Sequence, residues 1–150
     1  MRNIDNLQEF KVVAWDTLTG LQTLHQKGQT HRDIRAANAR WTLNSQRVHV
    51  SLVDLSTCGP TGRRPTVHLK DWHIQQPSQT SEGGTFTLDS NGRYTEASDI
   101  RQLGVMLQRL SSCQPWEAAS RSLVDALISQ QLSARSAQAH DYFEQFRAGL

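Results

Sequence analysis

Apolar residues recur every three or four positions in four stretches of the chain, which is the spacing of an amphipathic helix. The first stretch begins at Asp5 or Asn6, either of which can cap a helix, and ends near Gly28. Further helices are expected over residues 94–110, 116–131 and 136–146. The pattern therefore predicts a mainly α-helical protein.

Between the first two of these helices, a shorter pattern predicts a β-hairpin. Residues 40–43 favour a strand, residues 44–46 form a turn cluster, and residues 47–53 alternate between polar and apolar before Asp54 ends the run. Asn38 and Asp54 are nearly equidistant from the turn. Antiparallel pairing is therefore expected to set them side by side at the open end of the hairpin.

A third polar residue, Asp33, lies in the loop just before this hairpin. With Asn38 and Asp54 it would bring one amide oxygen and two carboxylates to a single loop edge. Mg²⁺ prefers oxygen ligands of this kind and completes its octahedron with water and phosphate. The arrangement therefore suggests a site for phosphoryl transfer.

Four motifs resemble the C-terminal lobe of protein kinases, in the same order and at similar intervals. H-R-D-I-R-A-A-N at 31–38 resembles the catalytic loop H-R-D-L-x-x-x-N, and V-D-L-S at 53–56 resembles the D-F-G element. L-Q-T-L-H-Q-K-G at 21–28 resembles the L-x-x-L-H-x-x-G motif that precedes the loop. S-D-I-R-Q-L-G-V-M-L at 98–107 resembles the S-D-I-W-S-L-G-V-M-L opening of the central helix. The resemblance implies one kinase-like C-lobe over residues 1–150, an α+β lobe that is mainly α with a small β-hairpin; H-R-D-I-R also resembles kinase-like effectors of the Crinkler type.

This resemblance implies a role for each polar residue of the predicted site. Asp33 would accept the proton of the acceptor hydroxyl, while Asn38 and Asp54 would hold Mg²⁺ against the phosphates of ATP. Arg35 completes the expected catalytic set; it stands where Ser/Thr kinases usually carry Lys, and R-A-A-N also occurs in some tyrosine kinases. The acceptor specificity is therefore left open.

The same resemblance implies supporting roles for three further residues. His31 would pack and form hydrogen bonds rather than act as a base. Arg32 would meet a phosphate on the activation segment, where a guanidinium can bind two oxygens at once. Asp99 would accept hydrogen bonds from the backbone of the catalytic loop and hold it rigid.

The parts of a kinase N-lobe have no counterpart in this sequence. The glycine-rich loop and the V-A-I-K lysine are missing, because no glycine precedes Gly20 and Lys11 falls within the first helix pattern. These parts hold the nucleotide phosphates. The resemblance therefore implies a C-lobe without an N-lobe, weak or inactive by itself unless a separate N-lobe or a partner completes it.

The segment after Asp54 departs furthest from the family. Ser56 replaces the glycine of D-F-G, whose conformational freedom affects how that segment turns. Residues 59–91 are rich in Pro, Gly, Ser, Thr and Gln, which predicts a long activation or substrate-binding loop with little regular structure. The A-P-E motif that should close this loop is missing, and its expected partner Arg135 is one position out of place.

Composition excludes several functions. With 16 Lys and Arg residues against 14 Asp and Glu, the formal charge is only +2, so no nucleic-acid partner is expected. Cys58 and Cys113 do not suggest a disulfide framework, and no leader or long apolar run is present. We expect an intracellular protein, cytoplasmic or nuclear, without a membrane partner.

The sequence thus predicts a Mg-ATP-dependent phosphotransferase module that acts on a protein hydroxyl, with a protein substrate or partner. Two alternatives stay open. A pseudokinase would bind or scaffold a partner without catalysis. A small-molecule phosphotransferase of the aminoglycoside type would share an H-x-D-x-x-x-x-N loop, although that family usually lacks Arg after the His.

Overall fold

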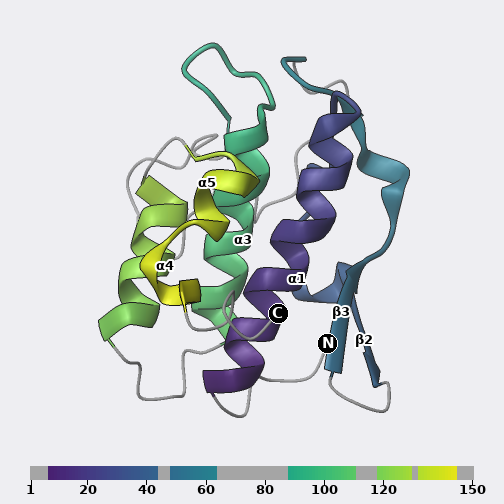
Figure 1. The fold of residues 1–150 in the computed structure, drawn as a ribbon. Helices are drawn as coiled ribbons and strands as arrows, with labels where there is room; N and C mark the ends of the chain where they lie inside the picture. The colour runs from purple at the N-terminus through teal and green to yellow at the C-terminus, as the bar shows by residue number, and fades with distance from the viewer. Residues whose placement is uncertain (1–6, 44–47, 64–87, 111–117, 130–131, 145–150) are drawn as a thin grey trace.

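The structure is a computed structural model that describes residues 7–43, 48–63, 88–110, 118–129 and 132–144. Within these residues the helices are α1 (Leu7–Gln26), α3 (Glu96–Leu110), α4 (Ala118–Ser129) and α5 (Ala134–Gln138). The strands are β1 (Gln29–Thr30), β2 (Ala39–Leu43), β3 (Val48–Leu52) and β4 (Gly59–Pro60), and the 3₁₀ turns are η1 (Ala36–Asn38), η2 (Leu55–Thr57) and η3 (Asp141–Phe143). The predicted fold, mainly helical with a small β-hairpin, is confirmed (Figure 1).

Helix α1 buries the face that its apolar spacing predicts. Leu18 and Leu21 are completely buried in the core. The helix ends in a turn at Gly28, which has φ 71°, a left-handed conformation that glycine adopts at little cost. The predicted end of this helix is confirmed, whereas its predicted cap at Asp5 or Asn6 lies outside the described residues.

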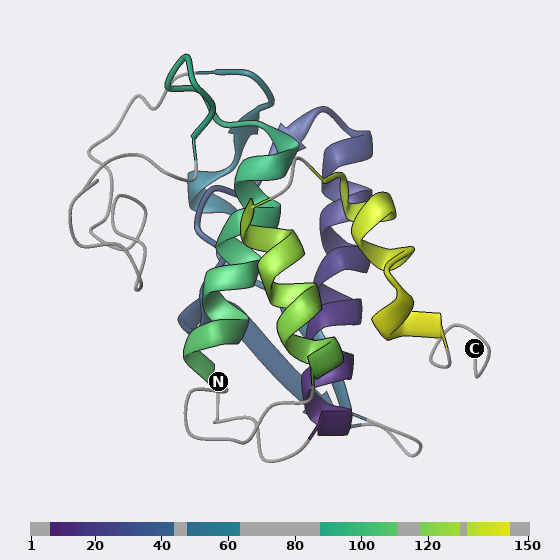
Figure 2. The same ribbon diagram turned by 90° about the vertical axis from the view of Figure 1, so that its left-hand side faces the viewer.

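Helix α3 packs against both α1 and α4 and lies between them in Figure 1. Figure 2 shows the fold from the side of α4, which lies in front of α1. Its apolar face is buried as predicted, with Ile100, Leu103 and Leu107 fully enclosed. Gly104 allows α4 to approach closely, because a Cβ atom at this position would lie 2.7 Å from Cγ1 of Ile128. The absence of a side chain at position 104 therefore sets the distance between α3 and α4.

The C-terminal helices differ from the expected ones at one point. Helix α4 lies within the predicted range of 116–131, but the helix predicted over 136–146 is interrupted: α5 stops at Gln138 and η3 follows. His140 is the cause, because its backbone is extended with ψ 145° and its Nδ1 accepts a hydrogen bond from the Tyr142 backbone N–H at 3.0 Å. This side-chain cap replaces a helical bond and turns Tyr142 and Phe143 into the core.

The β-hairpin packs against α1, on the side away from α4 (Figure 1). Strands β2 and β3 are antiparallel, with Ala39 opposite Leu52 and Trp41 opposite Val50. Val50 is buried, and its backbone N–H donates to Oδ2 of Asp16 on α1 at 3.0 Å. The predicted hairpin is confirmed, and α1 fixes its position.

A second small sheet pairs β1 with β4, with Thr30 opposite Gly59. Nothing in the hydrophobic pattern predicts this pairing, because each strand has only two residues. The segment 59–91, predicted as a loop, therefore begins with a strand; its residues 64–87 lie outside the described part of the chain. Across the described residues, no helix combines the length and apolar character needed to cross a membrane.

Candidate functional site

The loop between β1 and η1 is fixed by a buried carboxylate on the central helix. Asp99 is completely buried. Its Oδ2 accepts the backbone N–H of His31 at 2.8 Å, and its Oδ1 accepts the backbone N–H of Arg32 at 2.8 Å. The predicted role of Asp99 in holding this loop is therefore confirmed.

Two further side chains fix this loop, and sequence reasoning missed both. Gln102 is completely buried; its Oε1 accepts the Ile34 N–H at 3.0 Å and its Nε2 donates to the Arg32 carbonyl at 3.2 Å. His25 donates from Nε2 to Oδ2 of Asp99 at 2.8 Å. A signal was present for Gln102, because it lies three residues after Asp99 and therefore on the same face of a helix.

His31 links this loop to the segment that carries Asp54. Its side chain is completely buried, and Nδ1 accepts the Asp33 backbone N–H at 3.2 Å. Nε2 must then carry the proton, which it donates to the Val53 carbonyl at 3.1 Å. Thr57 adds a hydrogen bond from its hydroxyl to the His31 carbonyl at 2.8 Å. His31 is therefore a packing and hydrogen-bonding residue, as predicted.

Asp33, Asn38 and Arg35 form a connected group. Asp33 is completely buried and Asn38 is nearly so. The Asn38 amide nitrogen donates to Oδ2 of Asp33 at 2.9 Å and to its backbone carbonyl at 2.9 Å. On the other carboxylate oxygen, Arg35 Nε forms an ion pair at 3.2 Å with Oδ1, although its own side chain is partly exposed. The structure thus brings together three of the four predicted site residues.

The fourth predicted residue, Asp54, lies at the end of β3. The register pairs Asn38 with Val53, whose N–H donates to the Asn38 carbonyl at 2.8 Å, so Asp54 lies one residue beyond the position opposite Asn38. Asp54 has a left-handed backbone with φ 59°, and its Oδ1 accepts hydrogen bonds from the N–H and the hydroxyl of Ser56. Ser56 therefore stabilises one turn of this segment.

The region beyond Asp54 contains two groups with raised pKa values. Burial, more than any neighbouring charge, raises the pKa of the Cys58 thiol, and the negative charge of Asp99 adds to this effect. Burial also raises the pKa of Tyr94 to about 12, against the opposing charge of Arg32. Both groups are therefore neutral at physiological pH.

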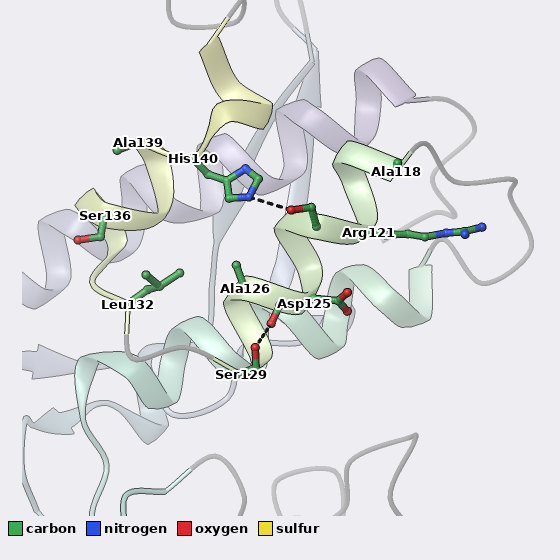
Figure 3. Close-up of a pocket in the computed structure, with 10 residues that line it drawn as sticks. Ala118, Arg121, Asp125, Ala126, Ser129, Leu132, Ser136, Ala139 and His140 are labelled. Carbon is green, nitrogen blue, oxygen red and sulfur yellow. Dashed lines mark hydrogen bonds between the residues drawn. The ribbon is translucent and has the colours of Figure 1, made fainter.

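A separate cavity of about 570 Å³ lies between α4 and α5 and contains a serine and a histidine (Figure 3). Ser122 Oγ and His140 Nε2 are 3.4 Å apart. Because Nδ1 of His140 accepts from the backbone of Tyr142, Nε2 carries the proton and donates to the serine. In this tautomer His140 cannot remove the proton of Ser122, so the pair is no activated nucleophile.

Among the described residues, no group of three His, Cys, Asp or Glu side chains could hold a metal ion. A cation here would depend on the Asn38 amide oxygen, the Asp54 carboxylate and oxygens from water or phosphate. This is the ligand type that Mg²⁺ uses in phosphoryl transfer.

The kinase-like motifs of this loop and of α3 receive partial support from sequence comparison. No protein-family profile matches the chain. Partial similarities to several protein kinases nevertheless support a kinase-like domain.

Three such relatives illustrate the extent of the similarity. Mitogen-activated protein kinase kinase kinase kinase 3 of Homo sapiens is 29% identical over 108 residues, which cover 69% of this chain and 11% of the relative. Eukaryotic translation initiation factor 2-alpha kinase pek-1 of Caenorhabditis elegans is 29% identical over 99 residues, or 61% of this chain and 9% of the relative. Putative mitogen-activated protein kinase 14C of Drosophila melanogaster is 25% identical over 103 residues, or 69% of this chain and 26% of the relative. The chain therefore spans only a small part of each relative's length.

Proposed function

We propose that this chain is the metal- and acceptor-binding module of a Mg-ATP-dependent protein kinase. The observation that carries the proposal is the buried pair of Asp33 and Asn38, held at 2.9 Å on a loop whose backbone is fixed by Asp99. The similarity to protein kinases favours a protein hydroxyl over a small molecule as the acceptor.

In this proposal Asp33 orients the acceptor and takes its proton. The hydroxyl oxygen attacks the γ-phosphorus of ATP, the bond to the bridging oxygen of ADP breaks, and the proton passes to the Asp33 carboxylate. The hydrogen bond from Asn38 and the ion pair with Arg35 restrict the orientation of that carboxylate. Such positioning is the main contribution a protein makes to this reaction.

Asn38 and Asp54 are the residues proposed to hold Mg²⁺. The fit is chemical: the Asn38 amide nitrogen is already bonded to Asp33, which leaves the amide oxygen for a cation, and Asp54 is exposed to solvent. When bound, Mg²⁺ would neutralise the charge of the ATP phosphates.

Calorimetric titration with Mg-ATP tests this proposal on the 150-residue chain. Wild-type protein is compared with Asp54→Asn and with Asp125→Asn, a control that removes one exposed carboxylate from α4. Saturable heat is expected for wild type and the control, and none for Asp54→Asn. Equal binding by Asp54→Asn would contradict the proposed ligand set.

A second variant separates nucleotide binding from transfer. Asp33→Asn should keep the heat of Mg-ATP binding while lowering phosphate transfer by about 10²–10⁴-fold, the usual contribution of a general base. Unchanged transfer by Asp33→Asn would exclude Asp33 as the proton acceptor.

One observation favours a second candidate, a pseudokinase that binds a partner without catalysis. Leu55, directly after Asp54, is 62% exposed and is the only large apolar side chain so exposed among the described residues. An exposed leucine beside the site suits a surface that a partner covers. Absence of heat in the wild-type titration would favour this candidate over the enzyme.

A further inference from the structure

The residue before Asp33 has an unfavourable backbone conformation. Arg32 has φ 75°, a left-handed value that in the described residues is shared among non-glycine residues only by Asp54. Residues other than glycine disfavour the left-handed region, so surrounding contacts must hold Arg32 there. The contacts of the Arg32 side chain therefore affect where the next residue, Asp33, lies.

The Arg32 guanidinium is bonded within its own chain. Nε donates to the Thr30 hydroxyl on β1 at 3.1 Å, and Nη2 donates to the Pro60 carbonyl on β4 at 2.8 Å. On β4, Gly59 packs so closely that a Cβ atom there would lie 2.6 Å from the guanidinium. Arg32 as a whole is 9% exposed. These contacts tie the loop to both strands of the small sheet.

Tyr94 supplies the remaining contact. The guanidinium carbon of Arg32 lies 4.9 Å from the centre of the Tyr94 ring, within the range of a cation–π interaction. Tyr94 as a whole is 3% exposed, and low exposure strengthens such an interaction. The Tyr94 backbone is itself fixed, because its N–H donates to the Arg63 carbonyl at 2.8 Å and its carbonyl accepts the Gly62 N–H at 2.7 Å.

We propose that Tyr94 is a positioning residue for the Asp33 loop, acting through the Arg32 guanidinium, and that this internal tie keeps the loop in place without a bound phosphate. The proposal deepens the proposed function, on which its meaning for catalysis rests. It differs from the expectation, drawn from the family resemblance, that Arg32 meets a phosphate on the activation segment. Here the Arg32 guanidinium instead contacts an aromatic ring and a backbone carbonyl.

Hydrogen exchange of the backbone amides at residues 31–34 tests the tie without requiring nucleotide or activity. Tyr94→Leu removes the aromatic face but keeps an apolar side chain, and we expect these amides to exchange about 10- to 30-fold faster, as loss of a buried cation–π contact implies. Tyr94→Phe keeps the aromatic face, so the amides of this variant should exchange at the wild-type rate. Arg93→Lys, a change at the neighbouring exposed arginine, is the control and should have no effect.

A double variant asks whether Tyr94 acts through Arg32. Arg32→Gln should loosen the same amides, and adding Tyr94→Leu to it should produce little further change, because the cation–π contact is already lost in Arg32→Gln. Additive effects, or loosening by Tyr94→Phe, would overturn the proposal. Equal loosening of the amides at Leu18 and Leu21 in the core would overturn it as well, since it would reveal a general structural role.

Inorganic phosphate provides the last comparison. The exchange of residues 31–34 in wild type should be the same with and without phosphate. Slower exchange on adding phosphate would mean that Arg32 is a phosphate receptor, and the proposal would be wrong. Since none of these measurements involves ATP, a failed nucleotide titration and a failed tie are distinguishable.

Discussion

Asp99→Asn is the substitution with the largest expected effect on the site for the smallest change in shape. The Asp99 carboxylate accepts three hydrogen bonds at 2.8 Å, from the N–H groups of His31 and Arg32 and from His25 Nε2. An asparagine has only one acceptor oxygen. Its best orientation keeps the two bonds made by Oδ2 and turns its amide nitrogen toward the Arg32 N–H, where two donors then face each other.

The size of this effect follows from the lost bond. A hydrogen bond to a charged group contributes about 1.5–3 kcal/mol, and the two that persist become weaker because their acceptor is neutral. We therefore expect Asp99→Asn to lower the free energy of unfolding by about 3 kcal/mol, a large fraction of the stability of a typical domain.

Urea denaturation, followed by tryptophan fluorescence, measures this loss. Asp125→Asn serves as the matched control, because the same chemical change at an exposed position of α4 should alter stability by less than about 0.5 kcal/mol. A loss below about 1 kcal/mol for Asp99→Asn would refute the reasoning, since it would mean that the three bonds contribute little.

Two further predictions concern packing and pH. Gly104→Ala should destabilise the fold by about 1–3 kcal/mol, because its Cβ atom would collide with Ile128. Gly20→Ala, at an exposed position of α1 with open space around it, should stabilise the fold by about 0.5–1 kcal/mol. Thermal unfolding distinguishes the two variants, and equal effects would contradict the close approach of α4 to α3. Because the pKa of Tyr94 is raised to about 12 while an unfolded tyrosine titrates near 10, the folded state holds this proton more tightly. At most about 3 kcal/mol of stability is then present below about pH 10 and lost as the pH rises through about 12. Tyr94→Phe should flatten this decline in alkaline denaturation curves, and an unchanged curve would argue against it.

Local patterns predicted the elements that depend on neighbouring residues. The spacing of Leu18 and Leu21 and the glycine at position 28 define where α1 buries its face and where it ends. The hairpin could be placed because a turn cluster separates two alternating runs. Its register, however, was predicted one residue off at its open end, since Asn38 pairs with Val53. A pattern of period two indicates a strand but does not fix where its pairing ends.

The proximity of Asp33 and Asn38 was also predicted from the sequence, because they lie five residues apart on one loop, and a hydrogen bond joins their side chains. The resemblance of residues 98–107 to the opening of the kinase central helix predicted that Asp99 would hold the loop. It did not predict that Gln102 would bond the loop on both sides, although its position three residues after Asp99 places it on the same helix face.

Only the tertiary structure determined the contacts between distant segments. His25 and Asp99 are 74 residues apart and meet because α1 and α3 pack together. Arg32 reaches Tyr94 and Pro60 because the two-residue strands β1 and β4 pair, which no local preference would produce. The sequence by itself determined which residues could do chemistry and which helices would form. The packing of those helices determined which polar groups were buried together, because the cost of burying them alone is relieved only by partners from other elements.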